Sequence, residues 1–245
     1  ALTSSTKTFS ASAQPVNNFK TNVLIEDFTG AWCGYCTRVA YKLQELKKKT
    51  SQIVVVAAHY GDALQYSKIS EMTNAFGVSS YPHARLNRTT KWNETESAVT
   101  SLYANSSKVG VLIESSIDGR TLTLKVKAKF SETYTDLKLG VFLLENDLLL
   151  DQANYGDFGY GSDNPIVNFE HDDVLRVALT SPLGDNISSE STKVGSVFEK
   201  SFTYEIPNSY DKDKMDIVAF ITDKDKMSLN ARHSEIGKTQ EFEEL

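Results

Sequence analysis

Cysteine is nearly absent from this sequence: only two of its 245 residues are cysteine, and both lie in the segment DFTGAWCGYCTR, residues 27–38. A disulfide-rich secreted scaffold is excluded, because such small domains depend on several cysteine pairs. Two cysteines separated by two residues are compatible with a structural disulfide, half of a metal site or a redox couple. The residues around the pair and elsewhere in the chain distinguish among these three roles.

Long apolar runs are absent as well. The longest, 53–58 and 141–144, are far shorter than the roughly 20 residues that a membrane-spanning helix requires, so we expect no membrane-embedded segment. The chain opens with ALTSSTKTFSASAQP, which has no initiator Met and none of the regions of a signal peptide. We interpret residues 1–20 as a flexible linker, of the kind that separates a lipidated N-terminal cysteine from a folded domain. Any membrane contact would then be through that lipid.

An excess of positive charge is also missing. The chain has 26 Lys and Arg against 32 Asp and Glu, a formal net charge of -6, and its densest basic cluster, Lys47 to Lys49, falls at the end of an expected helix. Nucleic acid is therefore not an expected partner. With 40% hydrophobic residues the chain can bury a sizeable core, in one large domain or two ordinary ones.

The pattern over residues 21–107 alternates between strands and helices. Strands are predicted at 22–28, 52–58 and 79–87, and a helix follows each of them. The first helix begins at Cys36 and carries apolar residues at i, i+4 and i+7, namely Val39, Leu43 and Leu46. In the second, Asp62 is the predicted N-cap and Gly77 the stop. This order predicts an α/β domain.

The character of the chain changes near Ser107. Seven strand-like runs follow, several with clean alternation, and we predict an antiparallel, immunoglobulin-like β-sandwich domain over 108–245. The acidic, glycine-rich stretch DQANYGDFGYGSDN, residues 151–164, lacks the spacing and closing Glu of an EF-hand, so we interpret it as a solvated loop rather than a calcium site.

The placement of the cysteine pair favours redox chemistry. A free cysteine with a pKa of about 8.5 is mostly protonated at neutral pH, whereas the start of a helix offers unpaired N–H groups and a positive dipole end that stabilise a thiolate. Cys33 lies just before the predicted helix and Cys36 one turn further in. We therefore expect Cys33 to project outward and attack, and Cys36 to resolve the mixed disulfide.

Two further residues fit this chemistry. Asp27 lies six positions before Cys33 on the preceding strand, where a buried carboxyl with a raised pKa could accept the proton of Cys36. The alternation of a strand places Glu26 on the opposite face, and the pattern alone leaves open which acid the helix covers. Pro82 follows Tyr81 in an extended context, and a cis bond there would present a backbone edge to a substrate chain.

These features resemble the thioredoxin superfamily over about residues 21–105. The resemblance rests on VLIEDFTGAWCGYC, the amphipathic helix after it, the strand VVVAAH and the Tyr81-Pro82 pair. It implies roles for five residues. Cys33 would be the nucleophile, Cys36 the resolving cysteine and Asp27 the buried acid. Trp32 would be the tryptophan before the motif, and Pro82 the cis-proline. The Gly-Tyr pair inside the motif is similar to that of bacterial periplasmic disulfide isomerases.

The C-terminal part resembles a second family. FEHDDVLRVALTS, residues 169–181, is similar to the Omp28-like outer membrane proteins of Bacteroidetes, which join a thioredoxin-like domain to a β-sandwich. The resemblance implies an exported protein of the cell envelope, in the periplasm or at the outer membrane. It implies little about substrate.

We therefore expect an extracytoplasmic thiol–disulfide oxidoreductase, of reductase or isomerase type, whose only redox group is the Cys33–Cys36 disulfide and which needs no cofactor or metal. The expected substrate-binding residues are Trp32, Tyr35, Tyr81 and Pro82. Its partners would be exported proteins with thiols or disulfides and a redox recycling partner.

Three alternatives stay open. The disulfide could be structural, although a loop of two residues restrains the unfolded chain little. A metal site would need His59 or His83 as additional ligands, and no second CxxC is present to complete it. The protein could also be a non-catalytic binding or adhesion lipoprotein of the envelope, in which the sandwich binds the partner.

Overall fold

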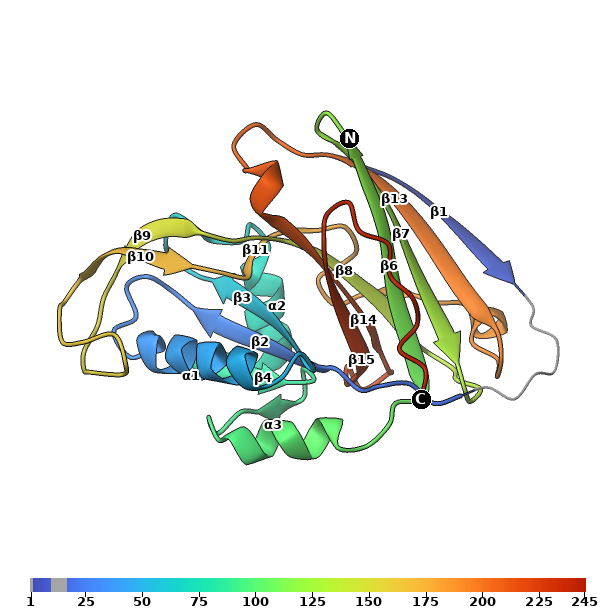
Figure 1. The fold of residues 1–245 in the computed structure, drawn as a ribbon, viewed down its shortest axis with the longest axis horizontal. Coiled ribbons are helices and arrows are strands. Elements are labelled where there is room, and N and C mark those ends of the chain that lie inside the picture. The colour runs from blue at the N-terminus through green and yellow to red at the C-terminus, as the bar shows by residue number, and fades with distance from the viewer. Residues whose placement is uncertain (1, 10–16) are drawn as a thin grey trace.

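The computed structural model describes residues 2–9 and 17–245, and Figure 1 shows a helix-bearing part beside a strand-rich part. The N-terminal elements are β1 (Leu2–Phe9), β2 (Val23–Thr29), α1 (Cys36–Lys49), β3 (Ile53–His59), α2 (Ile69–Phe76), β4 (His83–Leu86), β5 (Thr90–Lys91) and α3 (Glu96–Tyr103). The elements that follow are β6 (Val109–Asp118), β7 (Thr121–Phe130), β8 (Lys138–Glu145), β9 (Leu148–Gln152), β10 (Ile166–His171), β11 (Val174–Ala178), β12 (Asp185–Asn186), β13 (Val197–Glu205), β14 (Met215–Thr222) and β15 (Ser228–Glu235). No helix among the described residues is long and apolar enough to cross a membrane.

The predicted α/β domain is confirmed as three layers. Strands β2 and β3 run parallel, and β4 runs antiparallel to β2. Every residue of β2 and β3 is buried, because helices cover both faces of the sheet at these strands. The apolar stripe of α1 packs on one face together with Val99 of α3, and α2 covers the other. The predicted start of α1 at Cys36 is confirmed, whereas α2 begins at Ile69 and not near Asp62, which has another role described below.

The predicted β-sandwich is also confirmed. One layer has the strand order β1-β13-β7-β6, and it packs on β15-β14-β8 through inward-facing residues such as Leu124 and Val126. In β8 the residues alternate between two cores: Val141 and Leu143 face the sandwich, whereas Phe142 and Leu144 face α2. Both faces of β8 are therefore covered, which explains its unbroken apolar run.

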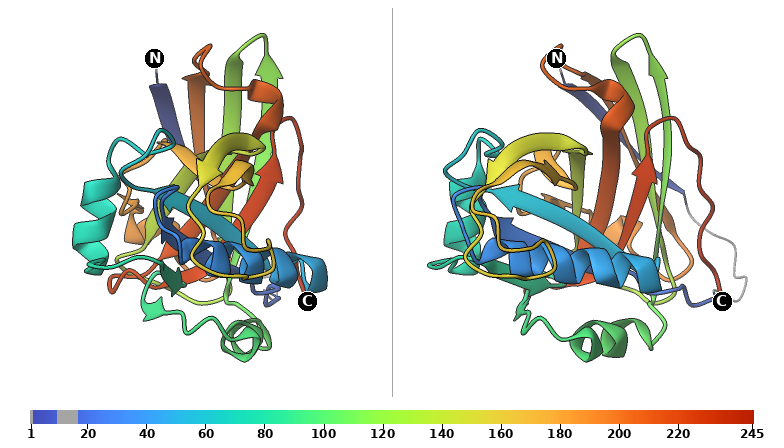
Figure 2. Two further views of the ribbon diagram at one scale, coloured as in Figure 1. Left: turned by 90° about the vertical axis from the view of Figure 1, so that its left-hand side faces the viewer. Right: turned by 60° about the vertical axis from the view of Figure 1, so that its left-hand side comes forward.

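The two predicted domains share one sheet. Its strand order is β15-β14-β8-β11-β3-β2-β4-β5, and β11 joins the halves because Val174 pairs with Ala57 in parallel and with Glu145 in antiparallel register. Figure 2 shows this sheet passing behind α1 from one half into the other. The sequence predicts β11 inside a separate sandwich over residues 108–245, and for β11 this is wrong. Its short run of apolar residues did not indicate a partner more than 100 residues earlier.

The flexible linker predicted for residues 1–20 is wrong for Leu2–Phe9, which form β1 along the edge of β13. The described side chains of β1 are exposed, and the strand is held by backbone hydrogen bonds to β13. Backbone pairing of this kind leaves no side-chain pattern from which the strand could be predicted. Phe19 is fully buried and its backbone pairs with Ser107. Residues 1 and 10–16 of the predicted linker lie outside the described residues.

Candidate redox site

The site is centred on a disulfide between Cys33 and Cys36, in the turn that leads from β2 into α1. The turn is closed by two backbone hydrogen bonds: Cys33 N–H donates to the Gly30 carbonyl at 2.9 Å, and Cys36 N–H to the Cys33 carbonyl at 3.0 Å. Cys36 is the first residue of α1, so Cys33 faces the positive end of the helix as predicted. The expected outward projection of Cys33 is wrong for this disulfide form: Cys33 is 4% exposed and Cys36 is 2% exposed, so both cysteines are buried.

Asp27 lies on the face of β2 that α1 covers. It lines a cavity of about 90 Å³ together with Cys36 and His59, and the C-terminal half of the chain contributes Gln152 and His171 to the same cavity. Burial, aided by the charge of Glu94, raises the pKa of Asp27 to about 7. Within the described part of the chain, Asp27 Oδ1 has no hydrogen-bond partner. Asp27 is therefore placed to exchange a proton beside Cys36 near neutral pH.

Glu26 resolves the question that the strand pattern left open. It faces the opposite side of the sheet and pairs with Arg88, and both side chains are fully buried. Neither acid of β2 is solvated, and the acid on the face that α1 covers, beside Cys36, is Asp27.

Asp62, predicted as a helix N-cap, instead holds the loop before the motif. Its Oδ2 accepts the Ala31 N–H at 2.7 Å and lies 2.7 Å from Nδ1 of His59. The ring of His59 meets that of His171 at 5.0 Å, and burial lowers the pKa of His171 to about 4. The other histidine considered as a ligand, His83, is buried with its ring edge-on to Phe28 at 6.0 Å.

Aromatic side chains stand on two sides of the disulfide. On one side Trp32 donates its indole N–H to the Tyr60 carbonyl at 2.7 Å and meets the Tyr81 ring at 5.3 Å, and Tyr81 stacks on Tyr60 at 5.8 Å. The bond between Tyr81 and Pro82 is cis, as predicted. The structure thus brings three of the four expected substrate-binding residues together, and adds Tyr60.

The second aromatic group contains residues that the sequence did not indicate. Tyr35 meets Tyr155 at 5.4 Å and Phe158 at 6.4 Å. Among the described residues, four aromatic side chains are classed as exposed, and all of them belong to the two groups beside the disulfide: Trp32, Tyr35, Tyr60 and Tyr155. We call these two groups, with Tyr81 and Phe158, the aromatic rim.

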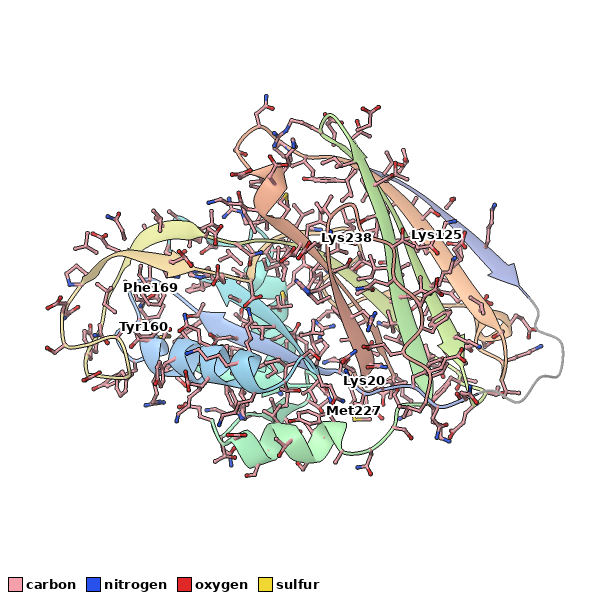
Figure 3. All side chains as sticks on the ribbon, viewed as in Figure 1. Lys20, Lys125, Tyr160, Phe169, Met227 and Lys238 are labelled. Carbon is pink, nitrogen blue, oxygen red and sulfur yellow. A yellow bond between two sulfur atoms is a disulfide. The ribbon has the colours of Figure 1, made fainter. Side chains whose placement is uncertain are left out.

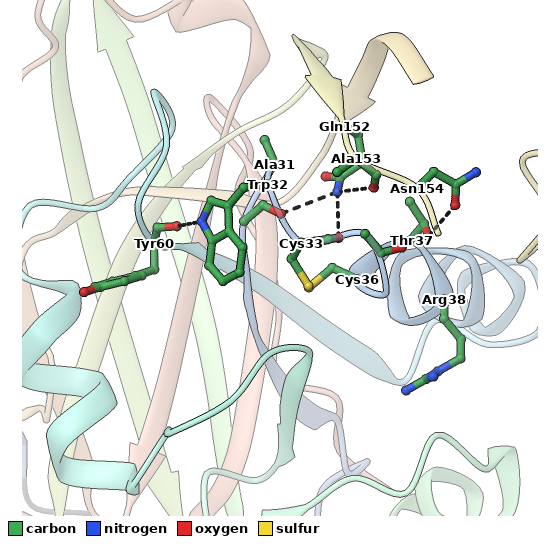
Figure 4. Close-up of a disulfide and its surroundings, with 12 residues drawn as sticks. Ala31, Trp32, Cys33, Cys36, Thr37, Arg38, Tyr60, Gln152, Ala153 and Asn154 are labelled. Atoms are coloured by element: carbon green, nitrogen blue, oxygen red, sulfur yellow. Dashed lines mark hydrogen bonds between the residues drawn. A yellow bond between two sulfur atoms is a disulfide. The ribbon is translucent and has the colours of Figure 1, made fainter. Parts of the chain in front are cut away.

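The segment 148–171, which we call the flap, comes from the C-terminal half and lies against the motif. Its backbone donates from Ala153 to the Ala31 carbonyl at 2.8 Å and from Tyr155 to the Gly34 carbonyl at 2.9 Å. Figure 4 shows Gln152 directed at the turn around Cys33 and Asn154 bonded to Thr37 in the first turn of α1. The interpretation of residues 151–164 as a solvated loop holds for the exposed residues 161–164 but is wrong for Gln152 and Asn154, which are buried against the motif.

The flap is anchored by packing as well as by hydrogen bonds. The buried amide of Asn154 accepts from the Thr37 hydroxyl at 3.0 Å, and a Cβ at Gly34 would lie 2.3 Å from the Tyr155 ring. Farther out, Tyr160 meets Phe169 at 5.0 Å, and both lie over the start of α1 in Figure 3. The glycines and acids of residues 151–164 favour solvent exposure, and the two residues of this stretch that are buried instead are Gln152 and Asn154.

Comparisons with known proteins agree with this architecture. The family model for thioredoxin matches residues 3–105, and the model for outer membrane protein Omp28 matches residues 69–240. Among solved structures, HBP35 of Porphyromonas gingivalis is similar, with a TM-score of 0.72 at 18% identity; the match covers 92% of this chain and 78% of that one. A search of curated proteins finds no match.

The HBP35 likeness supports the fold, and the two family matches account for both halves of the chain, including the β-sandwich that shares its sheet with the thioredoxin domain. The Omp28 match covers more than half of the chain and begins inside the α/β half, at α2. The chain therefore belongs to the Omp28 outer membrane protein family and carries a thioredoxin domain whose CxxC cysteines form a disulfide.

Proposed function

We propose that this protein is an extracytoplasmic thiol–disulfide oxidoreductase, of reductase or isomerase type, that acts on disulfides of exported proteins. The observation that carries the proposal is the Cys33–Cys36 disulfide at the start of α1, with Asp27 lining the cavity behind it. A purely structural crosslink requires neither a helix that starts at Cys36 nor a buried acid in the cavity beside that residue.

The reaction begins from the reduced pair. The Cys33 thiolate attacks one sulfur of a substrate disulfide, forming a mixed disulfide and releasing the other substrate sulfur as a thiolate. Cys36 then loses its proton to Asp27 and attacks the Cys33 sulfur, which closes the Cys33–Cys36 disulfide and releases the second substrate thiolate. Two electrons pass to the substrate. A thiol-bearing recycling partner returns them, and the disulfide form described above is the state that partner reduces.

The aromatic rim supplies the binding surface in this proposal. Exposed Trp and Tyr side chains bury large areas at little cost in conformational entropy, and they are enriched where proteins meet. A substrate segment that brings its sulfur to Cys33 lies between Trp32 on one side and Tyr35 with Tyr155 on the other.

We place this activity in the cell envelope. The Omp28 family match supports that location, and a lipid on an upstream cysteine is the form of membrane attachment we propose. Exported proteins that hold thiols or disulfides in that compartment are the proposed substrates.

The test uses two cysteine variants in parallel. Cys33→Ala is expected to abolish insulin reduction and the refolding of a scrambled disulfide substrate, whereas Cys36→Ala is expected to accumulate a mixed disulfide with the substrate, seen on a non-reducing gel. Insulin reduction that survives in Cys33→Ala would overturn the proposal.

A second candidate is a non-catalytic envelope binding protein with a structural CxxC. It is favoured by a polar groove of about 900 Å³ between the end of α1 and strands β14 and β15, lined among others by Lys47, Lys214 and His233. A reduction potential below about -300 mV, together with no mixed disulfide in Cys36→Ala, would support this candidate instead.

A further inference from the structure

Gln152, in the flap, donates from its side chain to the backbone of the redox motif. Its amide nitrogen lies 3.0 Å from the Cys33 carbonyl oxygen, 3.4 Å from that of Gly30 and 2.9 Å from that of Ala153. The atom at this position must be the amide nitrogen, because the amide oxygen has no proton to donate; its two protons serve three oxygens, so one of them is shared. Figure 4 shows these bonds converging beside Cys33.

Gln152 is 3% exposed, so these bonds lie in a poorly solvated place. Electrostatic effects are stronger there than at the surface, because little water screens them. Carbonyl oxygens carry partial negative charge, and those of Gly30 and Cys33 lie at either end of the turn that holds the Cys33 sulfur. A donor that binds both oxygens lowers the negative potential that a thiolate at Cys33 would meet.

The flap backbone adds to the same effect. The N–H groups of Ala153 and Tyr155 bind the carbonyls of Ala31 and Gly34, which alternate along the turn with the two that Gln152 binds. Donors from one segment thus bind four carbonyls of the turn around Cys33. Gln152 is the one whose donor can be removed by substitution, since the other two are backbone groups.

We propose that Gln152 is a positioning residue of the redox pair: it stabilises the Cys33 thiolate through the carbonyls of Gly30 and Cys33 and thereby sets the dithiol–disulfide equilibrium. This inference rests on the proposed function for its biological meaning. It concerns an equilibrium of the protein itself, so it can be tested without any substrate.

The sign of the effect follows from which state carries the charge. The reduced protein holds the thiolate and the oxidised protein does not, so a donor that stabilises the thiolate favours the reduced form. Loss of the donor raises the Cys33 pKa and makes the pair more reducing. The difference between variant and wild type grows as the pH rises through the Cys33 pKa and vanishes in acid, where Cys33 is a neutral thiol in both proteins.

The experiment compares Gln152→Met, which keeps the shape and removes the donor, with Gln152→Glu, which replaces the donor by a negative charge. The Cys33 pKa is followed by thiolate absorbance, and the equilibrium constant is measured in glutathione buffers at pH 5 and pH 8. At pH 8 we expect Q152M to shift the equilibrium three- to tenfold toward the disulfide; a tenfold change corresponds to about 30 mV. Q152E should shift it further, and both shifts should shrink at pH 5.

Gln44→Ala is the matched control, since Gln44 lines the same cavity from α1 and its loss also removes an amide. It should leave the Cys33 pKa unchanged. An equal shift at both pH values would assign Gln152 a purely structural role and overturn the proposal, as would an unchanged pKa in Q152M and Q152E. Failure of the proposed function is distinguishable, because it would appear as lost insulin reduction in a wild-type protein whose Gln152 variants still titrate as expected.

Discussion

Arg88 and Glu26 form an ion pair that is closed off from solvent. Arg88 Nε lies 3.1 Å from Glu26 Oε2, and both side chains have zero exposed surface. The guanidinium lies 4.8 Å from the ring centroids of Phe76 in α2 and Phe220 in β14. Its remaining bond goes to the Pro182 carbonyl. This one side chain therefore links the α/β half to the sandwich half.

Removing one partner of this ion pair should lower the free energy of unfolding much more than removing both. Arg88→Met is expected to lower the free energy of unfolding by about 3–5 kcal/mol, because it leaves the Glu26 carboxylate buried and unpaired. The double variant Glu26→Leu with Arg88→Met should recover most of that loss. Urea unfolding of the oxidised protein measures both.

An exposed ion pair provides the control for this prediction. Lys49 and Glu96 join α1 to α3 with side chains that are 53% and 50% exposed, so Lys49→Met should change stability by less than about 1 kcal/mol. If Arg88→Met cost no more than Lys49→Met, the role assigned to the buried pair would be wrong.

Asp27 should make the stability of the oxidised protein fall as the pH rises. The folded state keeps the Asp27 proton up to a pKa of about 7, raised by burial from 3.8, whereas the unfolded chain releases it near 3.8. Between these values the folded state binds more protons, so stability declines from about pH 4 to pH 7. Asp27→Asn removes this term and should be more stable than wild type above pH 7, by up to about 4 kcal/mol. Urea unfolding at pH 5 and pH 8 checks the slope, and equal wild-type and variant slopes would contradict the raised pKa.

Local patterns were sufficient for α1, for seven of the strands after Ser107 and for the motif. The start of α1 at Cys36 follows from the apolar spacing of Val39, Leu43 and Leu46, and the seven strand-like runs after Ser107 all became strands. These predictions need only neighbouring residues, because the apolar face of a helix or a strand repeats every few residues along the sequence.

The pairings that build the site could not be predicted in the same way. Gln152 reaches Cys33 across 119 positions, and β11 joins β3 through a single pair, Val174 with Ala57. A polar residue inside a glycine-rich stretch is predicted to be solvent-exposed unless its hydrogen-bond partners are known. The flap was missed for that reason, and Tyr155 and Phe158 were missed with it.

The contact between Gly34 and Tyr155 makes the docked flap testable by substitution. A Cβ at Gly34 would lie 2.3 Å from the Tyr155 ring, so Gly34→Ala must displace that ring and is expected to cost about 1–3 kcal/mol of stability. In a Tyr155→Ala background the same change should cost much less. A double-mutant cycle from urea unfolding gives the coupling energy. Additive costs would show that the ring does not press on the motif in solution.

The aromatic rim should act on large substrates and not on the chemistry itself. Trp32→Ala, Tyr155→Ala and their combination remove exposed rings on the two sides of Cys33, and none of these side chains donates to the turn that holds it. We therefore expect reduction of insulin to slow by about tenfold for each, in line with a loss of about 1–2 kcal/mol at an aromatic contact. Reduction of a small disulfide such as glutathione disulfide should change less than twofold. Val194→Ala, an exposed apolar residue of the sandwich half, serves as the control and should leave both rates unchanged. Equal losses on both substrates would mean that the rings alter the reactivity of Cys33, and the rim would then not be the surface on which protein substrates bind.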